Sequence, residues 1–216
     1  MIEVKDVCKK LDHNKVLDHI NITLEDGKIY GFIGHNGSGK SMLFRILCGL
    51  ICPSSGIVLM DGIDIHQKGI FHTSIGALIE RPRFLENVSG YQNLKLLADI
   101  NHKIDNKEIM EVLKAVGLYQ EKDKKFRKYS LGMKQKLGIA QAIMENPRIL
   151  ILDEPFNGLD RRSTDLIRNI IRNFKTPDRI IVISSHHIED IRYLCDVVYQ
   201  LDEGKIVSVK KMDGIL

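Results

Sequence analysis

The sequence predicts an α/β fold in which a buried parallel sheet is combined with a small antiparallel sheet and an inserted lobe of helices. Three patterns predict this arrangement. Short runs that are apolar on both faces recur between helical stretches, which is typical of a sheet covered on both sides. Alternating segments gather near the N-terminus, and the middle of the chain has helical periodicity alone. The 216 residues are enough for one sizeable core.

The N-terminal part is expected to form the antiparallel sheet. Residues 1–6 alternate apolar and charged side chains, as a half-buried strand does. We predict strands over residues 2–7, 20–24 and 56–60, with turns at Gly27 and Gly62.

The parallel sheet is expected from apolar runs that lack alternation, at residues 29–33, 149–152 and 180–184. Helical spacing of three and four residues occurs over residues 92–100 and 107–116, and a further helix is expected after Gly132.

These elements predict one domain over residues 1–216. Its core comprises residues 1–80 and 146–216, and residues 81–145 form the helical insertion. There is no internal repeat, so we expect each chain to carry a single copy of any functional motif.

A phosphate-binding loop joins the first parallel strand to a helix. It matches G-x-x-x-x-G-K-[ST] and reads Gly34-His35-Asn36-Gly37-Ser38-Gly39-Lys40-Ser41. Glycines let backbone N–H groups turn toward phosphates, and the helix N-terminus adds a positive dipole end. Lys40 is expected to neutralise the terminal phosphates, and the Ser41 hydroxyl to ligate Mg²⁺. A nucleotide and Mg²⁺ are therefore the expected ligands.

Two carboxylates follow the apolar strand at residues 149–152. Asp153 and Glu154 lie where ligands of open α/β sheets bind. We expect Asp153 to hold Mg²⁺ through water, and Glu154 to act as the general base for the water that attacks the γ-phosphate.

Composition excludes several other classes of protein. The net charge is +4, from 32 basic and 28 acidic residues, and the signs are interspersed except at residues 122–128. No nucleic-acid-binding surface is therefore expected.

No window approaches the ~18 apolar residues of a membrane span, and the N-terminus lacks the pattern of a signal peptide. We expect a cytoplasmic protein. The four cysteines and eight histidines show no metal-ligand spacing, so neither a metal site nor a disulfide is predicted for them.

Six motifs in one order resemble the ATP-binding cassette (ABC) family, specifically the nucleotide-binding subunit of an ABC transporter. They cover almost the whole chain: the phosphate loop, Ile79-Glu80, the segment Tyr129-Ser130-Leu131-Gly132-Met133, the strand ending in Asp153-Glu154, Asn157-Gly158-Leu159-Asp160, and Ser184-Ser185-His186. The fold implied is a P-loop NTPase cassette.

The resemblance implies that two cassettes share each nucleotide. Ser130 and Gly132 would reach the γ-phosphate held by the phosphate loop of a second copy, helped by the dipole of the helix that begins there. His186 would contact the γ-phosphate and the attacking water. Asp160 would link the two sites across the interface. The implied partners are a second cassette, forming a homodimer when ATP is bound, and an integral-membrane permease that holds the protein on the inner face of the membrane.

Two of three departures from the family pattern narrow the subgroup. The usual signature is Leu-Ser-Gly-Gly-Gln, whereas this chain keeps only Ser130 and Gly132. Glu80 stands where most members have a glutamine. Glu80 can ligate Mg²⁺, but it crowds negative charge around one cation, so we expect turnover to change in Glu80→Gln. This combination is similar to bacterial exporters of bacitracin and lantibiotics.

The third departure concerns the base of the nucleotide. Leu11 stands where the family usually has an aromatic residue that stacks on adenine. Weak discrimination between ATP and GTP is expected, unless another residue such as His13 supplies the platform.

The sequence thus predicts an ATPase that powers a permease and expels an amphiphilic peptide or drug. The alternatives are an ATP-dependent clamp on nucleic acid or ribosomes, and a regulatory module with little turnover. A clamp would be expected to have tandem cassettes, a long coiled coil or a large basic face. Glu154 and His186 argue against a module without turnover.

Overall fold

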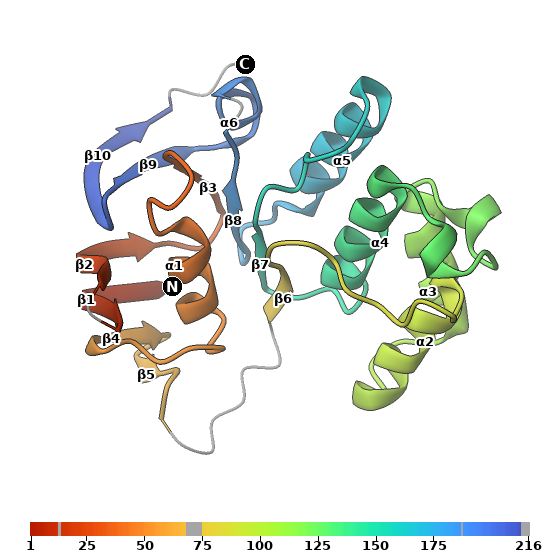
Figure 1. The fold of residues 1–216 in the computed structure, drawn as a ribbon, viewed down its shortest axis with the longest axis horizontal. Coiled ribbons are helices and arrows are strands. Elements are labelled where there is room, and N and C mark those ends of the chain that lie inside the picture. Colours follow the sequence, from red (N-terminus) through yellow and green to blue (C-terminus); the bar gives the residue numbers. More distant parts are fainter. Residues whose placement is uncertain (13, 68–74, 187, 213–216) are drawn as a thin grey trace.

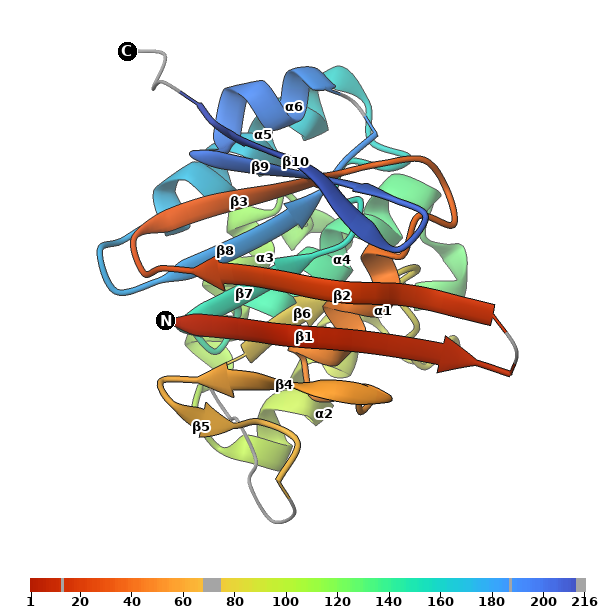
Figure 2. The same ribbon diagram turned by 90° about the vertical axis from the view of Figure 1, so that its left-hand side faces the viewer.

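The first layer of the fold is a four-stranded antiparallel sheet. A computed structural model describes residues 1–12, 14–67, 75–186 and 188–212. The strand order is β2-β1-β4-β5, as Figure 2 shows face-on. The strands are β1 (Ile2–Leu11), β2 (Asn14–Leu24), β4 (Ser55–Met60) and β5 (Ile63–Asp64).

The second layer is a six-stranded sheet with the order β10-β9-β3-β8-β7-β6. Its strands are β3 (Lys28–Ile33), β6 (Ile75–Leu78), β7 (Ile149–Leu152), β8 (Ile180–Ser184), β9 (Val197–Asp202) and β10 (Lys205–Lys211). Neighbouring strands are parallel except for the β9–β10 hairpin. The carboxyl ends of the parallel strands therefore meet along one edge, where ligands of such sheets bind.

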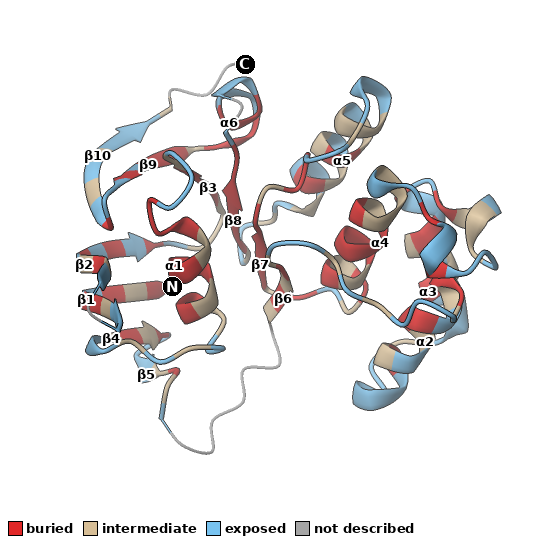
Figure 3. Ribbon diagram, viewed as in Figure 1, coloured by how far each residue is buried: buried red, intermediate tan, exposed pale blue. Residues whose placement is uncertain are grey.

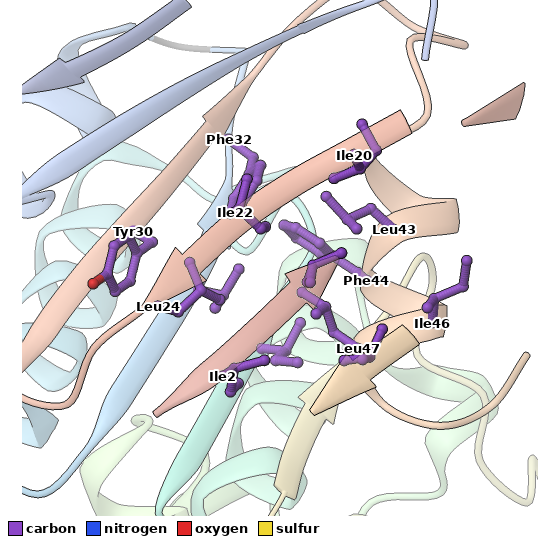
Figure 4. Packing of buried hydrophobic residues seen from close by; sticks show 14 of the residues in the cluster. Ile2, Ile20, Ile22, Leu24, Tyr30, Phe32, Leu43, Phe44, Ile46 and Leu47 are labelled. Carbon is purple, nitrogen blue, oxygen red and sulfur yellow. The ribbon is translucent and has the colours of Figure 1, made fainter. Parts of the chain in front are cut away.

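Helix α1 (Lys40–Leu47) lies between the two sheets (Figure 1). A helix covered on both sides must be apolar nearly all round, and α1 buries five apolar side chains in its eight residues. Figure 4 shows Leu43, Phe44 and Leu47 among side chains of both sheets. The rings of Phe44 and Phe32 meet edge to face, with centroids 5.4 Å apart. This packing fixes α1, and with it the loop that precedes the helix.

Helices α5 (Arg161–Phe174) and α6 (Ile188–Leu194) cover the other face of the six-stranded sheet (Figure 1). Each presents one apolar stripe to strands β3, β7 and β8. Ile167 and Ile171 of α5 are buried, whereas most of the remaining α5 residues are accessible (Figure 3). This one-sided burial is the pattern of a helix on a sheet surface.

Three helices form a separate lobe with its own apolar cluster. They are α2 (Gly90–Asn101), α3 (Asn106–Ala115) and α4 (Leu131–Ile143), with single 3₁₀ turns at Tyr119–Glu121 and Phe126–Lys128. Capping boxes at Ser89 and Asp105 begin α2 and α3. Helix α4 packs on both the lobe and strand β6. The predicted limits of the insertion, residues 81 and 145, enclose these helices, and the division of the chain there stays a prediction.

The predicted strands and helices are all present, with corrections at their ends. β1 continues to Leu11 and β2 begins at Asn14, beyond the predicted limits of both strands. The two strands stay paired past their buried part, where several side chains are charged. Strand β6 was not predicted, since Ile75-Gly76-Ala77-Leu78 is too short to show a period. Of the helices in the described residues, none is long and apolar enough to cross a membrane.

Candidate nucleotide-binding site

The phosphate loop connects the buried strand β3 to helix α1, as its motif predicts. Gly34, Gly37 and Gly39 all have positive φ, at 156°, 85° and 107°. A Cβ added to Gly34 would lie 2.2 Å from the carbonyl oxygen of Leu201, and one on Gly39 would lie 2.9 Å from that of Val16. Only glycine fits these two positions. The backbone is thus held in the form that an anion-binding loop requires.

The side chain of Lys40 is held at this loop by contacts with backbone carbonyl groups. Its Nζ donates hydrogen bonds to the carbonyl oxygens of Gly34, at 2.7 Å, and His35, at 3.1 Å. The side chain is buried, so the ammonium lies close to the loop and away from bulk solvent. A phosphate in the loop can accept hydrogen bonds from the same ammonium. Ser38 is also buried, and its carbonyl oxygen accepts a hydrogen bond from Gly204 N–H.

His35 braces the loop against the turn of the β9–β10 hairpin. Its Nε2 lies 2.8 Å from Asp202 Oδ1, and its Nδ1 lies 2.7 Å from the carbonyl oxygen of Asn36. Both partners accept hydrogen bonds, so the geometry favours the doubly protonated ring. The Asn36 carbonyl, followed by the Asp202 carboxylate, raises the pKa of His35 above its ordinary value.

The candidate Mg²⁺ site is a set of oxygen ligands at the carboxyl edge of the sheet. Asp153 is 4% exposed, and its two carboxylate oxygens accept hydrogen bonds from Ser41 Oγ, at 2.5 Å, and Ser184 Oγ, at 2.6 Å. Such hard oxygen donors suit Mg²⁺, which keeps several waters beside one or two protein ligands. The predicted pair of Ser41 and Asp153 is therefore brought together. Ser184 was part of a sequence motif without an assigned role, and it donates a hydrogen bond to Asp153.

Glu80, the third predicted ligand, follows strand β6 and has φ 60°. Its carboxylate forms an ion pair with Arg45, four residues after Ser41 on helix α1. Positions four apart share one face of a helix, so Arg45 lies on the side of α1 that carries Ser41. Arg45 offsets some of the negative charge expected around the cation. The role of Arg45 was not predicted from the sequence, because the only indication of it was the four-residue spacing from Ser41.

Glu154 and His186 form a hydrogen-bonded pair across the ends of β7 and β8. His186 Nδ1 lies 2.7 Å from Glu154 Oε2, and the His186 backbone N–H lies 3.3 Å from the same oxygen. Glu154 has φ 52°, an unusual conformation for this residue type. Two hydrogen bonds hold its backbone: its N–H donates to Ser184 Oγ at 2.9 Å, and its carbonyl accepts from Gln135 Nε2 at 3.0 Å. The pair has the geometry of a base with an orienting partner.

A cavity of about 250 Å³ brings these groups together. It is lined by Val16, Asn36, Gly37, Gly39, Lys40, Ser41, Met42, Arg45, Glu80, Asp153 and Glu154. Val16, Met42 and Arg45 were missed by sequence reasoning. Leu11 does not line this cavity in the described part of the chain and is 45% exposed at the end of β1. Its contact with adenine stays a prediction, and His13 lies outside the described residues.

The residues predicted to act on the nucleotide of a second copy lie at the N-termini of α4 and α5. Ser130 caps α4 by accepting a hydrogen bond from Met133 N–H at 3.2 Å, and Asp160 caps α5 by accepting one from Ser163 N–H at 2.7 Å. The Ser163 contact lowers the pKa of Asp160. Gly132 lies against Gly158, where an added Cβ would be 3.0 Å from a carbonyl oxygen.

Ser130, Gly132 and Asp160 do not line the cavity of the phosphate loop within the described residues. His186 faces a neighbouring cavity of about 500 Å³, beside Phe156, Leu159 and Arg168. One chain therefore brings together the phosphate loop, the acidic residues and His186, but not the serine and glycine of the second loop.

Comparison with known proteins gives consistent results. The family described as ABC transporter matches residues 17–157. An uncharacterised ABC transporter ATP-binding protein of Bacillus subtilis is 41% identical, over 98% of this chain and 97% of its own length. The bacitracin transport ATP-binding protein of Bacillus licheniformis is 41% identical, over 100% of this chain and 71% of its length. The lantibiotic transport ATP-binding protein of Streptococcus pyogenes is 36% identical, over 99% and 92%.

Solved structures share the fold along the whole chain. The dimeric ATP-binding cassette MJ0796, in a post-hydrolysis state bound to ADP and Pi, superposes with a TM-score of 0.89 at 22% identity, over 100% of both chains. An ATP-binding subunit of an ABC transporter superposes with a TM-score of 0.88 at 25% identity, over 99% of this chain and 90% of the other.

Proposed function

This chain belongs to the ABC transporter family, and from that premise we propose that two copies of it hydrolyse MgATP at shared sites and drive a separate membrane permease. ATP hydrolysis is characteristic of the family, and the chain is an ATP-binding subunit similar to those of bacitracin and lantibiotic transport. The predicted family, fold class and ATPase function are thereby confirmed. The nucleic-acid or ribosome clamp is not favoured.

The observation that carries the proposal is the Glu154–His186 pair beside the phosphate-loop cavity. With Nδ1–H directed at Glu154, the imidazole holds the carboxylate in place. Glu154 would accept the proton of the attacking water. Lys40 and the loop N–H groups stabilise charge on the phosphates. Mg²⁺, held by Ser41 and Asp153 with Glu80 nearby, would neutralise charge on the β- and γ-phosphates.

We attribute the shared site to the exposed ends of α4 and α5. Leu131, between Ser130 and Gly132, is 59% exposed, so this helix N-terminus faces outward from its own chain. Backbone N–H groups and the helix dipole at such an end attract phosphate. The γ-phosphate in the partner's loop would be the ligand of Ser130 and Gly132, and Asp160 would lie at the interface between the copies. The dimeric state of MJ0796 supports this arrangement.

We place the permease contact near Glu80 and the helical lobe, and we include in it a groove between the start of β6 and that lobe. This groove has a volume of about 160 Å³, and its lining mixes polar residues with apolar ones such as Ile75, Leu97, Ile100 and Pro147. Ile100 is 71% exposed there. A short permease segment that inserts into the groove would touch the first residues of β6, the strand that Glu80 follows at its other end. The transported substrate proposed is an amphiphilic peptide, as the names of the bacitracin and lantibiotic relatives suggest.

The first test is steady-state hydrolysis of MgATP by the purified chain. Glu154→Gln should lower kcat by about 100-fold or more, because the general base is lost. Glu203→Gln is the matched control, since Glu203 also has positive φ but lies in the β9–β10 turn. Equal rates in Glu154→Gln and the wild type would contradict the assignment of the base.

The second test addresses transport. In the source cell, replacement of the chromosomal copy by Glu154→Gln should increase sensitivity to bacitracin or to a lantibiotic. Unchanged sensitivity to every peptide tested, in cells whose purified wild-type chain hydrolyses ATP, would contradict peptide export and leave the ATPase assignment intact.

A further inference from the structure

A cluster of metal-binding side chain types lies outside the nucleotide cavity, on the β1–β2 hairpin. Cys8 of β1 and Asp18 and His19 of β2 offer one sulfur, one carboxylate oxygen and one imidazole nitrogen, all within 4.8 Å of one another. Their separation in sequence hides the cluster, which forms only when the two strands pair. The hairpin is irregular here, with register shifts on both sides of Val7.

Backbone conformation turns the side chains toward one another. Asp6 and His19 both have φ 52°, a conformation that costs free energy for residues other than glycine. The His19 N–H donates to Cys8 Sγ at 3.2 Å, so the sulfur lies directly beside the backbone of His19. Unusual backbone geometry at two facing positions is a common feature of ligand-binding sites.

The histidine is oriented by a carboxylate. His19 Nδ1 lies 2.6 Å from Asp6 Oδ1, and His19 Nε2 lies 3.5 Å from Asp18 Oδ1. With Nδ1–H directed at Asp6, the lone pair on Nε2 is available to a metal, as in the carboxylate–histidine–metal arrangement of many zinc sites. Bond lengths of about 2.1 Å in a tetrahedral site place neighbouring nitrogen and oxygen ligands about 3.4 Å apart, close to the separation of Nε2 and Oδ1.

We propose that Cys8, Asp18 and His19 bind one Zn²⁺ ion, with water in the fourth position. A thiolate, an imidazole and a carboxylate together favour zinc over Mg²⁺ and Ca²⁺, which prefer oxygen ligands alone. Cys8 is 5% exposed and His19 is exposed, so the metal would be held from the protein side and open to solvent on the other. Binding releases the thiol proton to solvent.

Two lysines compete with the metal. Lys15 Nζ is hydrogen-bonded to Asp18 Oδ1, and Lys205 Nζ lies 3.3 Å from Asp18 Oδ2. Both ammonium groups are at the surface and can move away, but they must be displaced from the carboxylate for it to bind a cation. Lys15 shares its oxygen with the proposed site, so its removal should strengthen zinc binding.

The site lies next to the nucleotide cavity. The Asp18 N–H donates to the carbonyl oxygen of Gly204 at 2.8 Å, and Val16, two residues earlier on β2, lines the cavity. A metal bridging β1 and β2 would therefore brace the strand that carries Val16. Zinc should raise the melting temperature of the nucleotide-free chain in proportion to the logarithm of its excess over the dissociation constant.

The test is a titration of the metal-free full chain, without nucleotide, with Co²⁺ as a spectroscopic probe and Zn²⁺ as its competitor. We expect one equivalent of Co²⁺ to give a thiolate-to-metal absorption band that Zn²⁺ abolishes. Cys8→Ser should lose the band, and His19→Asn should weaken binding by 100-fold or more. Asp6→Asn should weaken binding by about 10- to 100-fold, because it acts through His19.

Matched controls are available in the same chain. Cys52→Ser removes an exposed thiol, and His102→Asn replaces another histidine with φ 52°, so both should bind as the wild type does. Lys15→Gln should bind several-fold more tightly, an effect that a purely structural role of the cluster would not produce. Absence of the thiolate band in the wild type, or equal binding by Cys8→Ser, would overturn the proposal. Melting curves of each variant without metal report whether it has folded.

Discussion

The two parts of the proposed nucleotide site differ in how completely one chain builds them. The phosphate-loop part is buried and cross-braced, with Asp153 held between Ser41 and Ser184. The Ser130 and Asp160 part consists of two helix N-termini at the surface, each capped by its own side chain. In the proposed mechanism, binding and closure are separate functions. One chain would hold ATP, and the second part would act on a nucleotide that belongs to another chain.

The largest expected difference is in ATP binding by a single chain. Lys40→Ala should weaken ATP affinity on the order of 100-fold, because it removes a charge-assisted contact to phosphate from a buried position. Gly132→Asp should leave the affinity of dilute, monomeric chain unchanged. Equilibrium titration with a fluorescent ATP analogue checks both. Equal losses of ATP affinity in Lys40→Ala and Gly132→Asp would contradict the distinction between the phosphate-loop part and the Ser130 and Asp160 part.

A smaller effect is expected at the Glu80–Arg45 pair, within the phosphate-loop part. Glu80→Gln and Arg45→Gln should each change the Mg²⁺ concentration for half-maximal ATP hydrolysis several-fold. The double variant should not show the sum of the two effects, because the groups contact each other. Lys95→Gln breaks an exposed pair in the helical lobe and serves as the control. Additive effects would show that the two side chains act independently of each other.

Asp160 gives a separate test of the surface part. Asp160→Ala should lower the melting temperature by about 2–4 °C through loss of the α5 cap, whereas Asp160→Asn should keep most of the stability. Since the Ser163 N–H lowers the pKa of Asp160, its stabilising contribution is present at neutral pH and is lost as pH falls through the lowered pKa. Thermal melts at neutral and acid pH measure both. Equal destabilisation by Ala and Asn would contradict the capping role.

The smallest expected effect is the pH dependence of His35. Its pKa is raised above the ordinary value of 6.5, so its stabilising contribution is full below that value and is lost as pH rises through the raised pKa. The wild type should therefore melt higher than His35→Asn near pH 6, and the two should converge near pH 9. Asp202→Asn should remove part of the same pH dependence. A difference in melting temperature that stays constant across this pH range would show that the charged form of His35 does not stabilise the fold.

The sequence predicted the parts of the site that local motifs encode. The phosphate loop, Asp153, Glu154 and His186 each follow a buried strand, so the edge of the sheet brings them together. The roles of Arg45, Val16 and Ser184 were missed because they depend on which strands and helices become neighbours. Strand β6 was missed for a related reason. Four residues are too few to show a hydrophobic period, and they form a strand because they pair with β7.

The cysteines show the limit of reasoning from spacing. Their sequence separation indicated no metal site, yet pairing of β1 and β2 places Cys8 beside Asp18 and His19. The positive φ of His19 cannot be predicted from residue type, since most histidines avoid it. Irregular strand pairing is a tertiary feature, and it determines which side chains of this hairpin meet.

The most direct measurement of the central claim is the solution mass and nucleotide content of Glu154→Gln with MgATP, compared with Glu154→Gln combined with Gly132→Asp. The account predicts that the single variant shifts from monomer to dimer and retains two ATP molecules per two chains. The double variant should still bind ATP but remain monomeric. A monomer that binds ATP in both variants, or a dimer that forms equally well with Gly132→Asp, would contradict the shared site.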